Sequence, residues 1–251
     1  MRPVQKLKKE AFVLKQKADS PHQTAGLSGS TLKWIAMVTM VIDHIGAAIL
    51  LPLLNSGQLE SFDYSLAYTT YSIFRLIGRL AFPIFCFLLV EGFYHTSNKQ
   101  RYASRLGIFA LISEVPFNLA ISQQYLDSAH QNVFFTLLLG LCAMWIASKS
   151  HNRWLASIPI VVLAIVAELL HTDYGLFGVI LIGVLYLNRE HRFMQSFIGA
   201  LLVLWEGTAP ISFVMTYYYN GLRGAYNTKW LYWLYPIHLL LFGLIARYVI
   251  S

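Results

Sequence analysis

The sequence predicts an all-α fold, a polytopic membrane helical bundle with about nine transmembrane helices. Three observations predict it: 57% of the 251 residues are hydrophobic, only 12% are charged, and the mean hydropathy is +0.54. Apolar runs of about 20 residues recur along the chain, each long enough to cross about 30 Å of hydrocarbon as a helix. Soluble globular domains rarely have this composition, so we expect an integral membrane protein.

The first apolar run, residues 32–54, follows a basic and polar leader. It is too long for a secretory signal and lacks a small-residue cleavage site. We therefore expect residues 1–31 to form a basic cytoplasmic arm and residues 32–250 to form one transmembrane domain. The later runs predict spans at 72–94, 104–122, 132–148, 154–171, 174–188, 193–206, 209–220 and 231–250. Those at 193–206 and 209–220 are short enough to be re-entrant.

Basic residues are concentrated on one side of this predicted topology. With nine spans, sixteen of the nineteen Lys and Arg residues share a side with the amino terminus. The opposite loops carry acids instead, at Glu60, Asp63, Asp127 and Asp173. Because cytoplasmic loops are enriched in Lys and Arg, the amino terminus is predicted to be cytoplasmic. Membrane topology then explains the net charge of +7, and we expect the lipid bilayer rather than nucleic acid as a partner.

Two adjacent ionisable residues, Asp43 and His44, interrupt the first apolar run. At 1.5 Å per residue they lie about 16–18 Å along the helix from Leu32, near the bilayer midplane. Buried ionisable groups are costly unless they are paired, and neighbours on a helix point about 100° apart, so each needs a partner from another helix. Arg75 and Arg79, four residues apart, are candidates to hold Asp43 or a substrate anion. Snorkelling to the outer headgroups is the alternative, and it suits Arg75 better than Arg79.

Further polar residues in the apolar runs are candidates to line a substrate cavity. Glu91 is spaced to pair with His95, and Glu114 is spaced to pair with Asn118 across Pro116. His238 enters the membrane from the same predicted side as His44 and reaches a similar depth, so the two can line one cavity. The other candidates are Asn132, for which helix capping is an alternative, Asp173, for which a turn role is an alternative, and Tyr235.

No soluble-enzyme signature competes with this interpretation. The sequence contains no G-x-S-x-G, no H-E-x-x-H and no phosphate-binding loop. Cys86 and Cys142 both lie inside apolar runs without metal-ligand spacing. We therefore expect packing roles for both cysteines and no bound metal.

Six sequence blocks carry a family resemblance. They are "LKWIAMVTMVIDHIGA", "FRLIGRLAFPIFCFLLVEGFYHT", "ISEVPFNLA", "QNVFFTLLLG", "DYGLFGVILI" and "YPIHLLLFGLIA". In this order, over about residues 31–250, they resemble the TraX family, named for the membrane protein that acetylates the amino terminus of F-type conjugative pilin. The "DH" of the first span and the "YPIH" of the last also resemble wider membrane acyltransferases, including the heparan N-acetyltransferase type.

The resemblance implies a membrane acetyltransferase with His44 as its catalytic residue. Acetyl-CoA would arrive from the cytosol, its pantetheine arm would enter the membrane, and the acceptor would approach from the other side. A neutral histidine is suited to take a proton from an attacking amine or hydroxyl. Arg79, Asn118 or Tyr235 would stabilise the oxyanion, and spacing alone does not choose among them. Direct transfer and an acetyl-histidine intermediate both stay open.

A basic patch is expected to receive the phosphates of the donor. Lys99, Arg101 and Arg105 lie together at the predicted cytoplasmic side, although the positive-inside bias explains them equally well. The resemblance implies a pilin amino terminus as acceptor, and other peptide amines or surface glycans stay open, in a bacterial inner or plasma membrane. Two alternatives remain: a transporter or lipid-binding protein in which Asp43, Glu91 and Glu114 relay protons, and a non-enzymatic surface-assembly factor.

Overall fold

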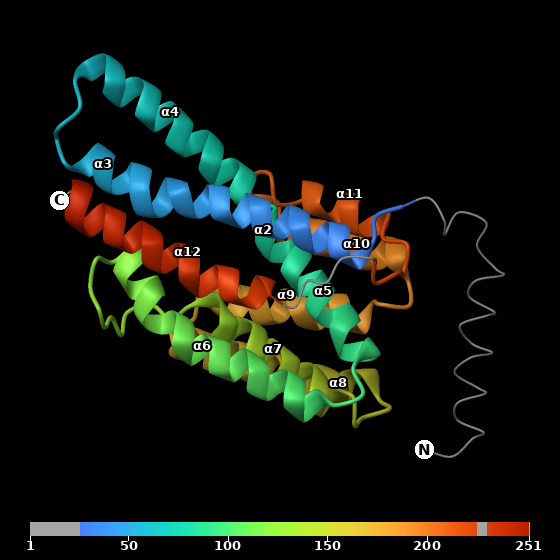
Figure 1. Cartoon of the computed structure of the whole chain (residues 1–251). Helices are drawn as coiled ribbons and strands as arrows, with labels where there is room; N and C mark the ends of the chain where they lie inside the picture. Colours follow the sequence, from blue (N-terminus) through green and yellow to red (C-terminus); the bar gives the residue numbers. More distant parts are fainter. Residues whose placement is uncertain (1–25, 225–229, 251) are drawn as a thin grey trace.

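The computed structural model describes residues 26–224 and 230–250, which form a bundle of helices (Figure 1). The predicted all-α class is confirmed. Strand-like pairing within the described ranges is limited to two isolated bridges, Leu27 with Tyr219 and Gln131 with Thr172. Residues 1–25 of the predicted cytoplasmic arm lie outside the described residues, and the first described helix begins within that arm, at Gly29.

The first predicted span is a nearly continuous helical rod. It consists of α2 (Gly29–Ile45), one π-helical turn η1 (Gly46–Leu50) and α3 (Leu51–Asn55). The Ser28 hydroxyl accepts a hydrogen bond from the Thr31 backbone N–H at 3.2 Å and caps the start of α2. Single π-turns often mark functional sites, and this one begins two residues after His44.

The second predicted span, residues 72–94, is divided between two helices. These are α4 (Ser61–Gly78) and α5 (Ala81–His95), separated by a turn at Arg79 and Leu80. Pro83 explains the break, because it has no N–H to bond the carbonyl of Arg79 four residues earlier. The predicted span lies within Ser61–His95, which is long and apolar enough to cross a membrane, and the break inside it lies beside two of the predicted site residues.

The remaining helices agree with the predicted runs to within a few residues at most ends. They are α6 (Lys99–Ile121), α7 (Val133–Ala147), α8 (Arg153–Leu169), α9 (Gly175–Leu187), α10 (Arg192–Leu202), η2 (Leu204–Glu206), α11 (Ile211–Tyr217), α12 (Leu231–Ile245) and η3 (Ala246–Ile250). The side chains of Asn98, Asn132 and Asn152 cap α6, α7 and α8. Pro116 lies inside α6 without ending it.

Length divides these helices into two groups. Within the described residues, four segments are long and apolar enough to cross a membrane: Gly29–Asn55, Ser61–His95, Lys99–Ile121 and Leu231–Ile250. α7 and α9 are apolar but shorter. α10 has 11 residues and α11 has seven, too few to cross about 30 Å at 1.5 Å per residue. The predicted runs are therefore helical, but nine full spans are not shown.

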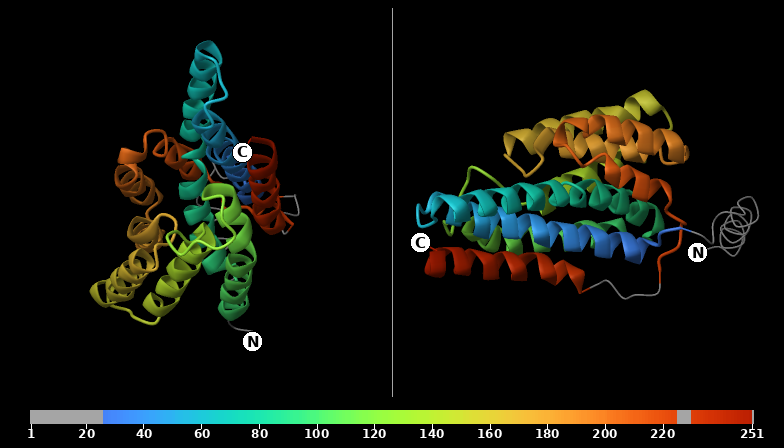
Figure 2. Two further views of the ribbon diagram at one scale, coloured as in Figure 1. Left: turned by 90° about the vertical axis from the view of Figure 1, so that its left-hand side faces the viewer. Right: turned by 90° about the horizontal axis from the view of Figure 1, so that it is seen from above.

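Helix α5 lies at the centre of the bundle. Seen end-on, α12 lies on one side of it, and α10 and α11 lie on the other (Figure 2). The starts of α2 and α6 and the end of α5 share one end of the molecule, while the ends of α3 and α12 lie at the opposite end (Figure 1). We call the first the basic end, because it carries Lys33, Lys99, Arg105, Arg189 and Arg223.

Apolar side chains occupy both the interior and the outer faces of the helices. Phe87, Leu141 and Leu239 are buried in one continuous core. On the outside, large apolar side chains such as Leu111 and Phe177 are exposed. An outer surface of this kind suits contact with lipid, in which the backbone hydrogen bonds of a helix are already satisfied.

Candidate functional site

Two histidines from helices at opposite ends of the chain meet inside the bundle. His44 of α2 and His238 of α12 are joined by a hydrogen bond of 2.6 Å between Nδ1 of His44 and Nε2 of His238. Their centroids are 4.9 Å apart and their planes 16° apart, so the two rings lie nearly edge to edge in a common plane, as the hydrogen bond requires. His238 is buried and His44 is half-buried. The expectation that these two residues lie together is confirmed.

Aromatic side chains fix the positions of both imidazoles. Tyr235 lies about one turn before His238 on α12. Its ring is edge-on to both imidazoles, with its centroid 5.8 Å from that of His44 and 5.9 Å from that of His238. Phe134 of α7 packs against Tyr235 at 5.0 Å, and Phe242 packs against His238 at 5.5 Å. Edge-to-face contacts at these separations favour defined ring orientations. Aromatic side chains of α7 and α12 therefore together fix the orientation of the imidazole pair.

Asp43 is bound by an arginine of α4 rather than by its neighbour His44. Arg75 Nη1 lies 2.6 Å from Asp43 Oδ2. Gly46 and Gly78 allow this contact, because a Cβ on Gly46 would meet the Arg75 side chain and a Cβ on Gly78 would collide with Asp43. The expectation that Asp43 finds its partner on another helix is confirmed. The interpretation of Arg75 as a snorkelling residue is wrong, because its guanidinium is paired with a carboxylate.

Arg79 points to a different acid. Its Nη1 lies 3.8 Å from Oε2 of Glu206, which follows α10 in the short helix η2. The charges of Asp43 and Asp173 also act on Arg79, so two arginines and three carboxylates form one cluster. The candidate role for Arg79 as the direct partner of Asp43 is therefore wrong. Glu206 was not predicted as a site residue, although an acid at the end of the apolar run 193–206 was a signal for it.

A second ionic cluster fastens α5 to the α9–α10 connection at the basic end. Arg189 donates to Glu91 through both Nε, at 3.2 Å, and Nη2, at 3.1 Å. Arg192 lies 3.7 Å from the same carboxylate, and His95 lies 3.7 Å from it on the same helix as Glu91. The Arg189 guanidinium also covers the Tyr94 ring at 4.0 Å. Bidentate pairing and stacking indicate that Glu91 holds the fold here.

Glu114 is paired, but with a residue of the next helix. Its Oε2 accepts hydrogen bonds from the Asn132 side chain at 2.5 Å and the Asn132 backbone at 3.3 Å. Asn132 Oδ1 in turn accepts the Phe134 N–H and caps α7, so the capping alternative is confirmed. The expected Glu114–Asn118 pair is wrong. Asn118 is buried, and its Oδ1 has no hydrogen-bond partner among the described residues.

Asp173 lies in the turn between α8 and α9. Its carbonyl oxygen accepts the Thr136 hydroxyl, and its N–H donates to the Gln131 carbonyl at 2.8 Å. Thr136 also hydrogen-bonds Thr172 at 3.0 Å. The backbone of Asp173 therefore has a turn role, while its charge belongs to the cluster around Arg79.

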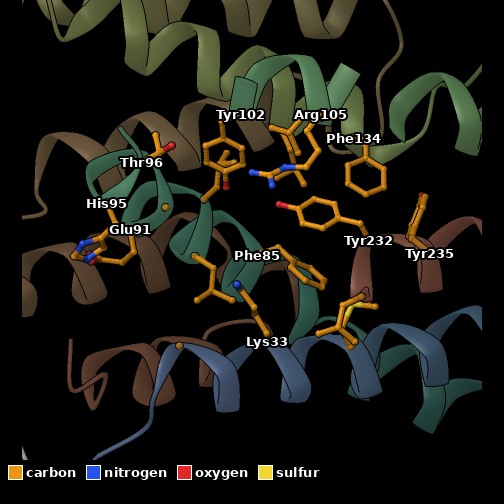
Figure 3. Close-up of a pocket in the computed structure, with 18 of the residues that line it drawn as sticks. Lys33, Phe85, Glu91, His95, Thr96, Tyr102, Arg105, Phe134, Tyr232 and Tyr235 are labelled. Atoms are coloured by element: carbon orange, nitrogen blue, oxygen red, sulfur yellow. The ribbon is translucent and has the colours of Figure 1, made fainter. Parts of the chain in front are cut away.

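A cavity of about 600 Å³ leads into the bundle from the basic end (Figure 3). Helices α2, α5, α6, α7 and α12 line it. Lys33, Arg105 and Arg223 line its outer part, where Arg105 and Arg223 are exposed. Arg105 packs between the Tyr102 ring at 5.3 Å and the Tyr232 ring at 5.2 Å. The outer part of the cavity is therefore both basic and aromatic, and Glu91 also lines the cavity, as predicted, together with His95.

Only one of the three predicted phosphate-binding residues lines this cavity. Arg105 does, whereas Lys99 and Arg101 are not among its lining residues. Lys99 lies over the Phe93 ring at 4.0 Å, and the backbone of Arg101 takes part in the Asn98 cap of α6. Lys33 and Arg223 were missed, because they come from distant segments that only the fold brings to Arg105.

The inner end of the cavity lies next to the histidine pair, which it meets through Tyr235, although neither His44 nor His238 is among its lining residues. Met40, Phe134 and Tyr235 are buried lining residues there. Met40 lies one turn before His44 on α2, and the Tyr235 ring contacts His44 directly. Apolar side chains between the two ends, including Met37, leave few polar groups to satisfy. A long ligand with an anionic head and a reactive far end has the shape and polarity that this cavity suits.

The part of the chain that forms the cavity is also the part that resembles known proteins. The family described as TraX protein matches residues 28–246, which include every helix that lines the cavity. The chain belongs to the TraX family. No solved structure matches it.

Two curated proteins are relatives of this TraX-family chain. A probable fimbrial assembly protein, FimC of serogroup H1, from Dichelobacter nodosus is 30% identical over 247 residues, covering 85% of this chain and 93% of that protein. An uncharacterised protein from Rickettsia prowazekii (strain Madrid E) is 27% identical over 114 residues, covering 45% of this chain and 35% of that protein.

Proposed function

We propose that this TraX-family chain is an integral membrane acetyltransferase. It takes an acetyl group from acetyl-CoA at the basic end of the bundle and transfers it to an amine or hydroxyl acceptor at the opposite side. The acceptor in this proposal is either a peptide amino terminus, such as that of a pilin, or a surface glycan. The basic end faces the cytosol in this proposal, since cytosolic loops are rich in Lys and Arg, and the membrane is the bacterial inner membrane.

The cavity is the observation that carries the proposal. Its outer part presents Lys33, Arg105 and Arg223 to the anionic head of the donor, and Arg105 can bind phosphate through its planar guanidinium. From Lys33 to His44 the α2 helix rises by about 16 Å, at 1.5 Å per residue, which suits an extended pantetheine arm. The apolar lining at Met37 and Met40 matches the uncharged arm. The residues present therefore fit acetyl-CoA as the acyl donor.

The chemistry assigned to His44 follows from its surroundings. As a base it removes the acceptor proton while the acceptor attacks the thioester carbon, and it returns that proton to the departing sulfur. The oxyanion needs a donor beside the cavity. Tyr235 lines the cavity, whereas Arg79 pairs with Glu206 and Asn118 is not a lining residue. We therefore assign this role to Tyr235. Attack by the acceptor and attack by His44 both remain open as first steps.

A specific observation also favours a non-enzymatic alternative. The relative from Dichelobacter nodosus is named a probable fimbrial assembly protein. A membrane factor that holds a surface subunit during assembly would share that name without transferring acetyl groups. The transporter alternative has less support, because Asp43, Glu91 and Glu114 each have a protein partner that would have to be released during proton relay.

Acetyl-CoA binding and thioester turnover separate these functions. The protein in nanodiscs is incubated with radioactive acetyl-CoA and a short peptide with a free amino terminus. We expect His44→Ala to bind acetyl-CoA as the wild type does and to lose turnover by about 100-fold or more, the usual contribution of a general base.

His151→Ala is the control, because His151 is exposed in the loop before α8 and lies outside the cavity lining. It should keep both binding and turnover. A wild-type protein that does not bind acetyl-CoA would contradict the proposal. Pilus or surface assembly that survives in stably expressed His44→Ala would favour the assembly factor instead.

A further inference from the structure

His238 has a contact on each ring nitrogen. Its Nδ1 faces the carbonyl oxygen of Leu234, one turn earlier on α12. Its Nε2 faces Nδ1 of His44 at 2.6 Å. The Leu234 carbonyl, His238 and His44 therefore form a hydrogen-bonded chain that runs from the backbone of α12 to the candidate base on α2.

The chemistry of the first contact fixes the proton positions in the whole chain. A carbonyl oxygen can only accept, so Nδ1 of His238 carries a proton. In neutral His238 the other nitrogen, Nε2, then has a free lone pair and accepts a hydrogen bond. Nδ1 of His44 must supply that proton, and Nε2 of His44 is left unprotonated. Only one neutral tautomer of His44 satisfies every contact.

We propose that His238 is a positioning residue for the acetyl transfer. It holds His44 in the tautomer whose Nε2 is free to act as base, and it accepts from the Nδ1 proton when His44 becomes an imidazolium. This inference rests on the proposed acetyltransferase function. During transfer the acceptor proton moves to Nε2 of His44, the carbon–sulfur bond breaks as the new acyl bond forms, and Nε2 returns the proton to the sulfur. The Nδ1 proton of His44 stays on that atom throughout.

The packing around His238 supports a fixed orientation. The side chain is 5% exposed, and the Tyr235 and Phe242 rings meet it edge-on at 5.9 and 5.5 Å. Buried polar groups are costly when they lose a hydrogen-bond partner, so the ring has a strong preference for the orientation that satisfies both nitrogens. Partners that orient metal-binding histidines typically affect activity by about 10- to 100-fold, and we expect an effect of similar size for His238.

Two substitutions of similar size separate the acceptor from the packing. In His238→Gln the side-chain oxygen can reach the position of Nε2 and accept from His44, whereas His238→Leu fills the space without an acceptor. We expect His238→Leu to lower kcat by about 10- to 100-fold, with acetyl-CoA binding and its KM unchanged. His238→Gln should recover most of that loss. Leu241→Val is the control, because Leu241 is 53% exposed on the outer face of the same helix, and it should keep wild-type kcat.

A nitrogen NMR spectrum tests the tautomer without any turnover. With ¹⁵N-labelled histidine in nanodiscs, the wild type should show His44 protonated at Nδ1, and His238→Leu should show a mixture of tautomers. A folded His238→Leu variant with wild-type kcat would overturn the inference, as would a wild-type His44 protonated at Nε2. If the wild type transfers no acetyl group, the proposed function fails, and the same spectrum still decides the tautomer.

Discussion

At the scale of single residues, the absence of a side chain at Gly78 sets the distance between α2 and α4. A Cβ at this position would lie 2.1 Å from Asp43 Oδ1 and 2.2 Å from Asp43 Cβ. Rotating the Asp43 side chain cannot relieve the second collision, because Cβ is fixed to the backbone. The Asp43–Arg75 ion pair therefore depends on a glycine one turn away from Arg75.

Gly78→Ala should destabilise the protein by about 1–3 kcal/mol, the usual cost of forcing an extra group into a packed interior. The measurement is the thermal unfolding midpoint in nanodiscs, compared with Gly107→Ala. Gly107 is also helical, but its Cβ would make only an ordinary contact with Leu138, at 3.7 Å. That control should be neutral or slightly more stable, since alanine favours helix. Equal midpoints for the two variants would show that α2 separates from α4 without cost.

At the scale of helices, the crossing of α6 and α12 positions the histidine pair. Gly243 of α12 packs against the backbone of α6, where an added Cβ would lie 2.9 Å from the Ala120 nitrogen. Small residues allow helices in membranes to approach closely, and this crossing holds the helix that carries Tyr235 and His238. Gly243 is five residues from His238, about 7.5 Å along the axis.

Gly243→Val should push α12 away from α6 and draw His238 away from His44. We expect lower thermal stability together with a loss of acetyl transfer of about tenfold or more, as for a displaced orienting residue. Leu241→Val is the control, because Leu241 is 53% exposed on the outer face of the same helix. Wild-type turnover in a folded Gly243→Val variant would mean that the pair tolerates movement of α12.

Helix positions and the central residue pair could be predicted from the sequence, but the choice of ionic partners could not. The apolar runs predict the helices, and depth along two helices predicts that His44 meets His238. Arg75 and Arg79 are four residues apart and would share a face of an unbroken helix, so spacing does not choose between them. The break before Pro83 separates them, and Arg79 turns to Glu206, which lies more than 120 residues later.

At the scale of the whole molecule, charge is distributed unevenly along the bundle. The cavity has basic residues at its outer part and aromatic and apolar residues at its inner end (Figure 3). The charges of Arg105 and Arg223 both act on Lys33, so three cations from separate segments share one mouth. Mutual repulsion among them is relieved when a polyanion binds, which favours a phosphate-bearing ligand over a neutral one.

Arg105→Glu tests whether this charge serves the acetyl donor. Reversing one charge beside bound phosphate at a partly exposed site should weaken acetyl-CoA binding by about 5- to 30-fold, equivalent to about 1–2 kcal/mol, and raising the salt concentration should reduce the difference. Arg101→Glu makes the same charge change one turn earlier on α6, outside the cavity lining, and should alter affinity by no more than about twofold.

Affinity is measured by titrating radioactive acetyl-CoA into each variant in nanodiscs. Equal weakening by the two variants would assign the effect to the general field of the basic end, whereas unchanged binding in both would place the donor elsewhere. A loss confined to Arg105→Glu would place the donor head at the mouth of this cavity, whose lining continues inward to Tyr235, and the Tyr235 ring contacts His44.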